Sequence, residues 1–139
     1  MTIFHLFSIS GEDICGYKSQ AVVTIKTKAG ENKVFEVGIA DIPSKYEKGL
    51  MNCKELKSGK GLFFIFKDDR PRYFWMKNTL IPLAIIYLDK DFKVVSTGKG
   101  VPLSQKTVPS INAARYVLEV NFEEGRNIQS GDKALFKMK

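Results

Sequence analysis

The sequence predicts a mainly β protein, α+β at most, folded as a compact single-domain β-barrel-like structure with one or two short helices. Short runs rich in β-branched and aromatic residues alternate with turn residues, and only one stretch changes to helical spacing. At 139 residues, the chain is long enough to bury a core within one domain. Many short strands with about one helix are typical of a barrel or of a sheet folded on itself.

The N-terminal part begins with an expected loosely ordered arm at residues 1–19, followed by one barrel-like domain at 20–139. Residues 21–28 are β-branched and alternate, which suits a strand with one solvent-exposed face. A turn at 29–32 and a second strand at 33–40 complete a predicted hairpin.

A short helix is expected after the hairpin, because the apolar spacing changes there. Asp41 can cap a helix, and Pro43 fits the first turn. Tyr46, Leu50 and Met51 then form one apolar stripe. The predicted helix runs from about Pro43 to about Met51.

The middle of the chain holds a continuous apolar run at 62–66, which predicts a strand buried on both faces. Residues 67–71 are expected to form a polar turn, and 72–76 a strand. Residues 77–82 read as an irregular crossing, because Pro82 cannot donate to a strand ladder.

The C-terminal half is expected to be strands joined by turns. The predicted elements are strands at 83–88, 92–97, 114–120 and 133–138, a turn at 89–91, and a loop at 98–112. That loop is long enough to be functional or mobile. Asp132 follows Gly131 before the last strand, where an Asp most often accepts backbone N–H groups.

The charge is +7, from 22 basic and 15 acidic residues. The basic residues are mostly Lys, and no five of them are consecutive. Nucleic-acid readers usually show Arg-rich patches or a recognisable motif, so nucleic-acid binding is not favoured. A solvated lysine-rich face is the expected arrangement.

Cysteine and histidine content limits the chemistry. Cys15 and Cys53 could form one disulfide, but they lack metal or redox spacing, and a free Cys53 would act as a small hydrophobe. His5 is the only histidine, which argues against a His-based triad or a zinc site. The acidic residues cluster in turns. We therefore expect no metal and no cofactor.

No apolar run approaches the length of a transmembrane helix. Residues 3–9 are apolar but short, lack a basic region and run directly into Gly11-Glu12-Asp13, so they make a poor signal peptide. A cytoplasmic location is the default expectation, with an exported or periplasmic location as the alternative. The oligomeric state is not indicated.

Residues 74–83 are chemically mixed and hold the only tryptophan, Trp75. The tryptophan is either a core or rim aromatic, or a platform on which a ligand ring stacks. If Phe74 and Trp75 share a strand, they point to opposite faces, and only one of them can face a given cavity.

The candidate ligand-binding residues are Trp75, Lys77, Asn78 and Arg115. Lys77 is either solvated or holds an anion at a cavity, and Asn78 either binds a ligand or pins irregular backbone. Arg115 shares a strand face with Glu119. Either these residues pair with side chains of a neighbouring strand near a rim, or Arg115 places a cation at the mouth of a cavity.

Several motifs occur together in a fixed order, and together they resemble the family called domain of unknown function 192. The motifs are Lys48-Gly49-Leu50-Met51, Gly61 to Phe66, Phe74 to Leu83, Tyr116 to Glu119, and Ile128 to Asp132. The resemblance covers about residues 33–138. It implies a small β-rich, barrel-like domain of a family widespread in bacteria and archaea, in which many members carry an export signal or a membrane anchor. It implies no established activity.

Two departures from the family pattern stand out. Members often have Asp where this chain has Ala84, and an aromatic residue and an Arg where it has Asn52 and Cys53. If that Asp were catalytic in the family, this chain should lack the activity. Both departures weaken a shared catalytic site.

Three hypotheses for function follow. The leading one is a non-enzymatic module that binds a small molecule, a saccharide or a peptide. The second is an enzyme of unassigned class that uses Lys77 with a carboxylate such as Glu119, and it requires the two groups to converge in a cleft. The third is a structural or assembly role without a ligand.

Overall fold

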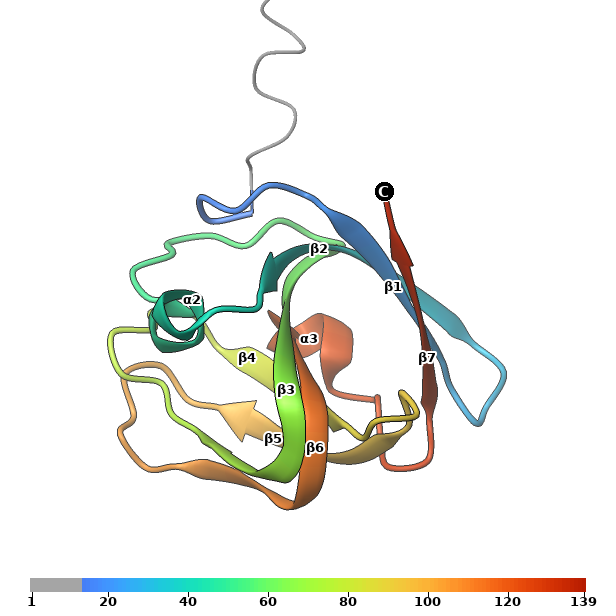
Figure 1. The fold of residues 1–139 in the computed structure, drawn as a ribbon. Helices are drawn as coiled ribbons and strands as arrows, with labels where there is room; N and C mark the ends of the chain where they lie inside the picture. Colours follow the sequence, from blue (N-terminus) through green and yellow to red (C-terminus); the bar gives the residue numbers. More distant parts are fainter. Residues whose placement is uncertain (1–13) are drawn as a thin grey trace, which may run out of the picture.

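The computed structural model describes residues 14–139, which fold into one seven-stranded sheet curled into a half-barrel (Figure 1). The strands are β1 (Ala21–Lys26), β2 (Asn32–Ala40), β3 (Lys60–Phe74), β4 (Leu83–Leu88), β5 (Val94–Gly100), β6 (Val108–Asn121) and β7 (Lys133–Met138). The short helices are α2 (Pro43–Lys48) and α3 (Phe122–Gly125). The predicted fold class is confirmed.

The strand order across the sheet is β5-β4-β6-β3-β2-β1-β7. Neighbouring strands are antiparallel except β2 and β3, which are parallel and joined by the crossing that contains α2. The two edges of the sheet meet at one corner, where Val94 N–H donates to Asp132 O at 2.8 Å and Ala134 N–H donates to Phe92 O at 2.9 Å. The two edges of the half-barrel therefore touch at this corner.

The sheet is apolar on both faces, because consecutive residues of its central strands join different clusters. Phe63 packs in a cluster shared by β1, β2, β4, β6 and β7, whereas Leu62 and Phe64 pack in a second cluster. This second cluster lies under α2 and the segment at 50–56. The prediction that 62–66 is a strand buried on both faces is confirmed for its first three residues, and the second face carries the site described below.

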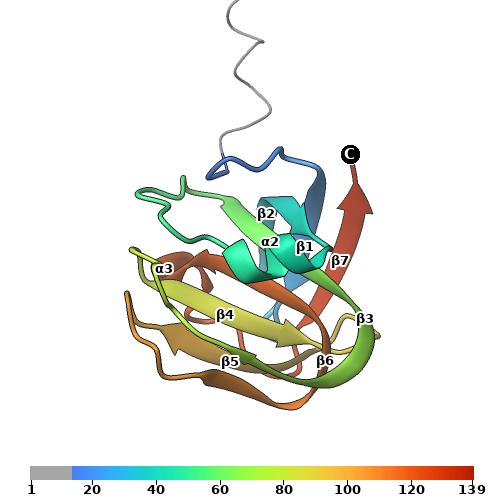
Figure 2. The ribbon, with the colours of Figure 1, turned by 60° about the vertical axis from the view of Figure 1, so that its left-hand side comes forward.

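The turn predicted at 67–71 is wrong. β3 continues through these residues, and its register with β6 shifts between Ile65 and Arg70. Such an irregularity bends a strand and tolerates Pro71, which has no N–H to donate. Figure 2 shows the bend of β3. The bend brings Phe64 and Phe74 into edge-to-face contact, with ring centroids 4.9 Å apart.

Smaller differences lie at element ends. The helix ends at Lys48 and not at Met51, and its N-cap is Ile42 and not Asp41. The loop expected at 98–112 is shorter, because β5 extends to Gly100 and β6 begins at Val108. The irregular crossing after β3 and the strands at 83–88 and 133–138 are confirmed.

The segment at 14–19 packs against the half-barrel, whereas residues 1–13 of the expected arm lie outside the described residues. Ile14 and Tyr17 are buried, and the Tyr17 hydroxyl donates to Gly49 O at 2.9 Å. A disulfide joins Cys15 to Cys53, with Cα atoms 5.4 Å apart. The chain before β1 is thus tied to the segment that follows α2.

Asp132 holds the turn before β7, as its sequence position predicts. The side chain is 1% exposed, and its two oxygens accept the N–H groups of Lys28 and Gln129, each at 2.9 Å. Two loops that are far apart in the sequence are therefore joined through one buried carboxylate.

Asp132→Asn should lower the free energy of unfolding by about 1 to 2 kcal/mol, because the amide can accept only one of the two N–H groups. Urea denaturation measures the change. Asp89→Asn is the control, since Asp89 accepts the N–H groups of Asp91 and Lys93 on the same oxygen, Oδ1, which asparagine retains. Equal losses in the two variants would contradict the explanation by a lost acceptor.

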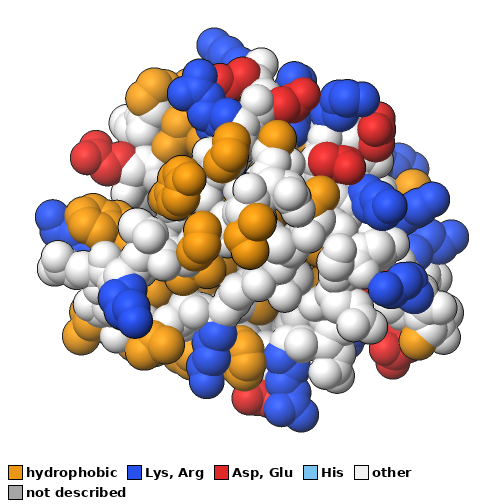
Figure 3. Space-filling view, turned by 90° about the horizontal axis from the view of Figure 1, so that it is seen from below, with side chains coloured by type: hydrophobic (Ala, Val, Ile, Leu, Met, Phe, Trp, Pro, Cys, Tyr) orange, Lys and Arg blue, Asp and Glu red, His pale blue; other side chains and the backbone are white. Residues whose placement is uncertain are grey.

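Charged side chains on the face seen in Figure 3 lie around its edge, with acidic groups between the basic ones and hydrophobic side chains nearer the centre. Among residues 14–139, no helix is long and apolar enough to cross a membrane.

Candidate functional site

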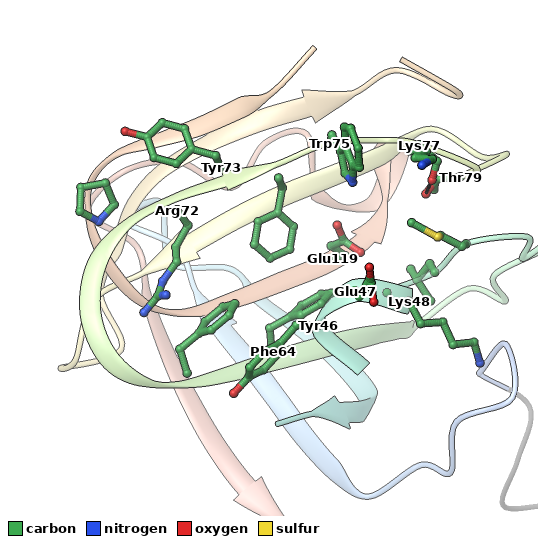
Figure 4. Close-up of a pocket in the computed structure, with 16 residues that line it drawn as sticks. Tyr46, Glu47, Lys48, Phe64, Arg72, Tyr73, Trp75, Lys77, Thr79 and Glu119 are labelled. Carbon is green, nitrogen blue, oxygen red and sulfur yellow. Dashed lines mark hydrogen bonds between the residues drawn. The ribbon is translucent and has the colours of Figure 1, made fainter. Parts of the chain in front are cut away.

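A cavity of about 370 Å³ opens on the second apolar face of the sheet (Figure 4). α2 and the residues just after it supply one side, and the two arms of the bent β3 supply another. Trp75, Lys77 and Thr79, which follow β3, lie at a third side. Glu119 of β6 lies between this side and the residues of α2. The bend of β3 and the crossing helix together create this hollow.

Aromatic rings form most of its wall. Tyr46 of α2 packs on Phe66 with ring centroids 4.5 Å apart, and its hydroxyl donates to Ile65 O at 2.7 Å. Phe74 contacts Phe64 edge to face, and its centroid lies 6.3 Å from that of Phe66. These contacts fix the rings against one another, so the cavity is preformed.

Glu119 is the unusual polar group of the cavity. β6 is a central strand, and Glu119 stands opposite Leu62 of β3 and Ile85 of β4, both fully buried. The residue is 4% exposed, and its carboxyl makes no hydrogen bond or ion pair with residues 14–139. Burial raises its pKa to about 8. In Figure 4 the carboxyl lies between the α2 residues and Trp75.

The cations around the cavity have other contacts. The Arg72 guanidinium lies 3.9 Å from the Phe66 ring centroid, pairs with Asp68 at 2.8 Å and donates to Ala114 O at 2.9 Å. Lys48 lies over the Tyr17 ring at 4.9 Å. Arg72 thus braces the bend of β3 and is not directed at Glu119.

Trp75 and Lys77 both line the cavity. The tryptophan is 43% exposed, and Lys77 Nζ lies 5.3 Å from its ring centroid. The expectation that only one of Phe74 and Trp75 can face a cavity is wrong, because β3 ends at Phe74 and Trp75 no longer follows strand alternation. Trp75 is a rim aromatic that a ligand can reach.

Asn78 and Arg115 do not line the cavity. Asn78 has a left-handed backbone with φ 55°, and its carbonyl accepts the N–H of Asn52 at 2.7 Å. Arg115 pairs with Asp69 at 2.7 Å across the β3–β6 ribbon. Of the four candidates, Trp75 and Lys77 therefore lie together at the cavity. Asn78 instead takes part in a backbone contact, and Arg115 forms an ion pair between β6 and β3.

Asn78→Ala should lower the free energy of unfolding by about 1 kcal/mol, because alanine tolerates the left-handed region less well than asparagine. Thermal unfolding measures the loss. Asn78→Gly is the control, and it should unfold close to the wild-type temperature since glycine adopts this conformation readily. If both variants are equally destabilised, a side-chain contact of Asn78 matters and the backbone explanation fails.

Lys77 and Glu119, the pair required by the enzyme hypothesis, share the cavity but form no ion pair within 4.0 Å. Residues 14–139 also contain no cluster of three or more His, Cys, Asp or Glu side chains placed to hold a metal ion.

Residues 24–136 match the family model DUF192, described as uncharacterized ACR. The chain belongs to the DUF192 family. The family resemblance of the ordered motifs is thereby confirmed. No curated protein matches the chain.

Two solved structures resemble this DUF192 chain closely. One is a candidate transcription regulator from Sinorhizobium meliloti 1021, with a TM-score of 0.81 and 29% identity over 86% of this chain and 95% of that one. The other is a protein of unknown function from Novosphingobium aromaticivorans DSM 12444, with a TM-score of 0.81 and 30% identity over 88% of this chain and 89% of that one.

The departure at Ala84 does not concern the cavity of this DUF192 protein. Ala84 pairs with Val120 and packs in the cluster on the first face of the sheet, whereas Glu119 lies on the second face. An Asp at position 84 would therefore point away from the cavity, and its absence is no argument against a site there.

The aromatic walls and the isolation of Glu119 are the features that sequence reasoning missed. The sequence predicts that Glu119 takes part in cross-strand pairing near a rim or acts as an acid with Lys77, whereas the structure buries it in a central strand without an ion pair to any of residues 14–139. Its burial had a signal in the sequence: Val117 and Glu119 share a strand face, so the acid follows an apolar position of a buried strand.

Proposed function

We propose that this protein is a non-enzymatic binding module that takes a small molecule, or one residue of a saccharide or peptide, into the aromatic cavity. The cavity of about 370 Å³ falls in the range of small-molecule sites, which are usually apolar with a few placed polar groups. Phe64, Phe66 and Phe74 supply apolar contact, and Trp75 offers an exposed ring at the rim.

The observation that carries the proposal is the buried carboxyl of Glu119. A buried polar group without a partner costs about 1 to 3 kcal/mol, and more when charged. Native structures keep few such groups, and they cluster at functional sites. A ligand group that meets Glu119 would satisfy it, and the preformed rings around it would be in place before binding.

The test is a calorimetric titration with a panel of small probes: D-glucose, benzyl alcohol, benzoate, benzamide, benzamidine and the dipeptide Ala-Phe. A double-stranded oligonucleotide joins the panel because of the description of the Sinorhizobium relative. We expect at least one small probe to bind and to be recovered unchanged. Its NMR shifts should be confined to residues 46–51, 64–66, 71–79 and the neighbourhood of Glu119.

Trp75→Ala should weaken that probe at least about threefold, because stacking on one exposed ring is worth about 1 kcal/mol. Leu135→Ala changes a more exposed apolar side chain on β7 away from the cavity, and this control variant should bind normally. If no small probe binds, or if binding ignores Trp75, the proposal falls. Turnover of a probe would favour the enzyme hypothesis instead.

A further inference from the structure

The chemistry around Glu119 narrows the class of ligand, an inference that rests on the proposed function. We infer that the cavity selects an organic cation with N–H donors, such as an ammonium, amidinium or guanidinium group, whose charge meets the Glu119 carboxylate. The aromatic rings would hold the body of the same ligand.

The first step is that Glu119 has no counter-charge of its own among residues 14–139. Arg72 is held by Asp68 and by the Phe66 ring, and Lys48 and Lys77 lie over the Tyr17 and Trp75 rings. No basic side chain of these residues lies within 4.0 Å of the Glu119 carboxylate. The cation that would balance it must come from the ligand.

The second step is the surroundings of the carboxyl. A cation is attracted both by a carboxylate and by the faces of aromatic rings, and this attraction grows when water is excluded. The contacts of Arg72 on Phe66 and of Lys77 on Trp75 show that rings of this wall already attract cations. A carboxylate that lines the same cavity as several aromatic rings is a combination that suits protonated nitrogen.

The third step concerns proton balance. Besides Glu119 and Tyr46, the ionisable side chains that line the cavity are Glu47, Lys48, Arg72, Tyr73 and Lys77, and Glu119 also acts on the phenols of Tyr17 and Tyr87. Burial, and secondarily Glu119, raise the pKa of both phenols, so they stay neutral near pH 8. Tyr46 also lines the cavity, and its hydroxyl is engaged with Ile65 O. Glu119 is therefore the group that must lose a proton when a cation binds.

Benzamidine and benzamide test the inference, because they are nearly the same size and shape and differ in charge. We expect benzamidine to bind the wild-type protein at least about tenfold more tightly than benzamide at pH 8, as suits a charge-assisted pair. Benzamidine affinity should rise about tenfold per pH unit below pH 8, since one proton leaves Glu119 on binding.

Glu119→Gln keeps the shape and removes the charge, so it should abolish both the preference for benzamidine and the pH dependence. Glu31→Gln, the same change at an exposed carboxylate between β1 and β2, away from the cavity, should leave both intact. Thermal unfolding of each variant checks that it is folded.

Three results would overturn the inference. They are equal affinities for benzamide and benzamidine, a benzamidine affinity that falls with rising pH, and a Glu119→Gln variant that prefers benzamidine as strongly as the wild type does. Loss of the preference in Glu31→Gln, or a failure of both probes to bind, would also overturn it. If benzamide or another neutral probe binds in the cavity while benzamidine does not, the proposed binding function stands and only the cationic class is wrong. If no probe of the wider panel binds either, both fall.

Discussion

Glu119→Gln should stabilise the protein at neutral and alkaline pH and remove most of its pH dependence between pH 5 and 8.5. The pKa of Glu119 is raised by burial from 4.5 to about 8, so the folded state favours the protonated carboxyl. The contribution of Glu119 to the free energy of unfolding is therefore fully present below its pKa in the unfolded state. It is lost as pH rises through its pKa in the folded state. At 1.36 kcal/mol per pKa unit, the loss in the wild type is about 4 to 5 kcal/mol.

Urea denaturation of both proteins at several pH values measures this effect. Glu47→Gln is the control and should keep the wild-type slope, because Glu47 is exposed. Glu36 and Asp68, whose pKa values are lowered chiefly by hydrogen bonds from Lys60 and Arg72, act at the acid end, where stability is lost as pH falls. A wild-type stability that stays constant from pH 5 to 8.5 would show that Glu119 has a partner.

Loss of the disulfide should be the second large effect. Cys15→Ser, or reduction of the wild type, should lower the free energy of unfolding by about 3 to 4 kcal/mol, since the bond closes a loop of 38 residues in the unfolded chain. Urea midpoints with and without dithiothreitol measure it. Cys15 is the residue to change because it is less buried than Cys53.

Dithiothreitol should not shift the midpoint of Cys15→Ser, which serves as the control for other effects of the reductant. Equal midpoints for oxidised and reduced wild type would contradict the prediction. Disulfides form and persist in oxidising compartments, so this pairing favours the exported alternative over a cytoplasmic location.

Local patterns predicted the parts of the fold that depend on local chemistry. The hairpin of β1 and β2, the strand at 83–88 and the role of Asp132 follow from alternation and turn residues. The continuation of β3 through 67–71 could not be predicted, because the charged residues there read as a turn and only pairing with β6 keeps them extended. The pairing of strands distant in sequence decided that case.

The site could also be predicted in part, because some of its residues stand out in the local sequence. Trp75 and Lys77 could be proposed because they stand out within one segment, and they do line the cavity. The role of Tyr46 and Phe66 in its wall depends on the bend of β3 and on how α2 crosses the sheet, which no local pattern reports. Asn78 stood out in the sequence for a backbone reason, its left-handed conformation.

The parallel pairing of β2 and β3 requires a crossing connection, and in this protein the crossing at 41–59 also covers the cavity. The register of the sheet is set by the strands on either side, so the length and sequence of the crossing can change while the sheet keeps its pairing. Relatives with insertions at this connection would then differ in the size of the cavity while sharing one scaffold. For protein engineering, Glu47 and Lys48 are the positions to randomise first, because they are exposed and line the cavity, whereas Leu50, Cys53 and Leu56 belong to the core.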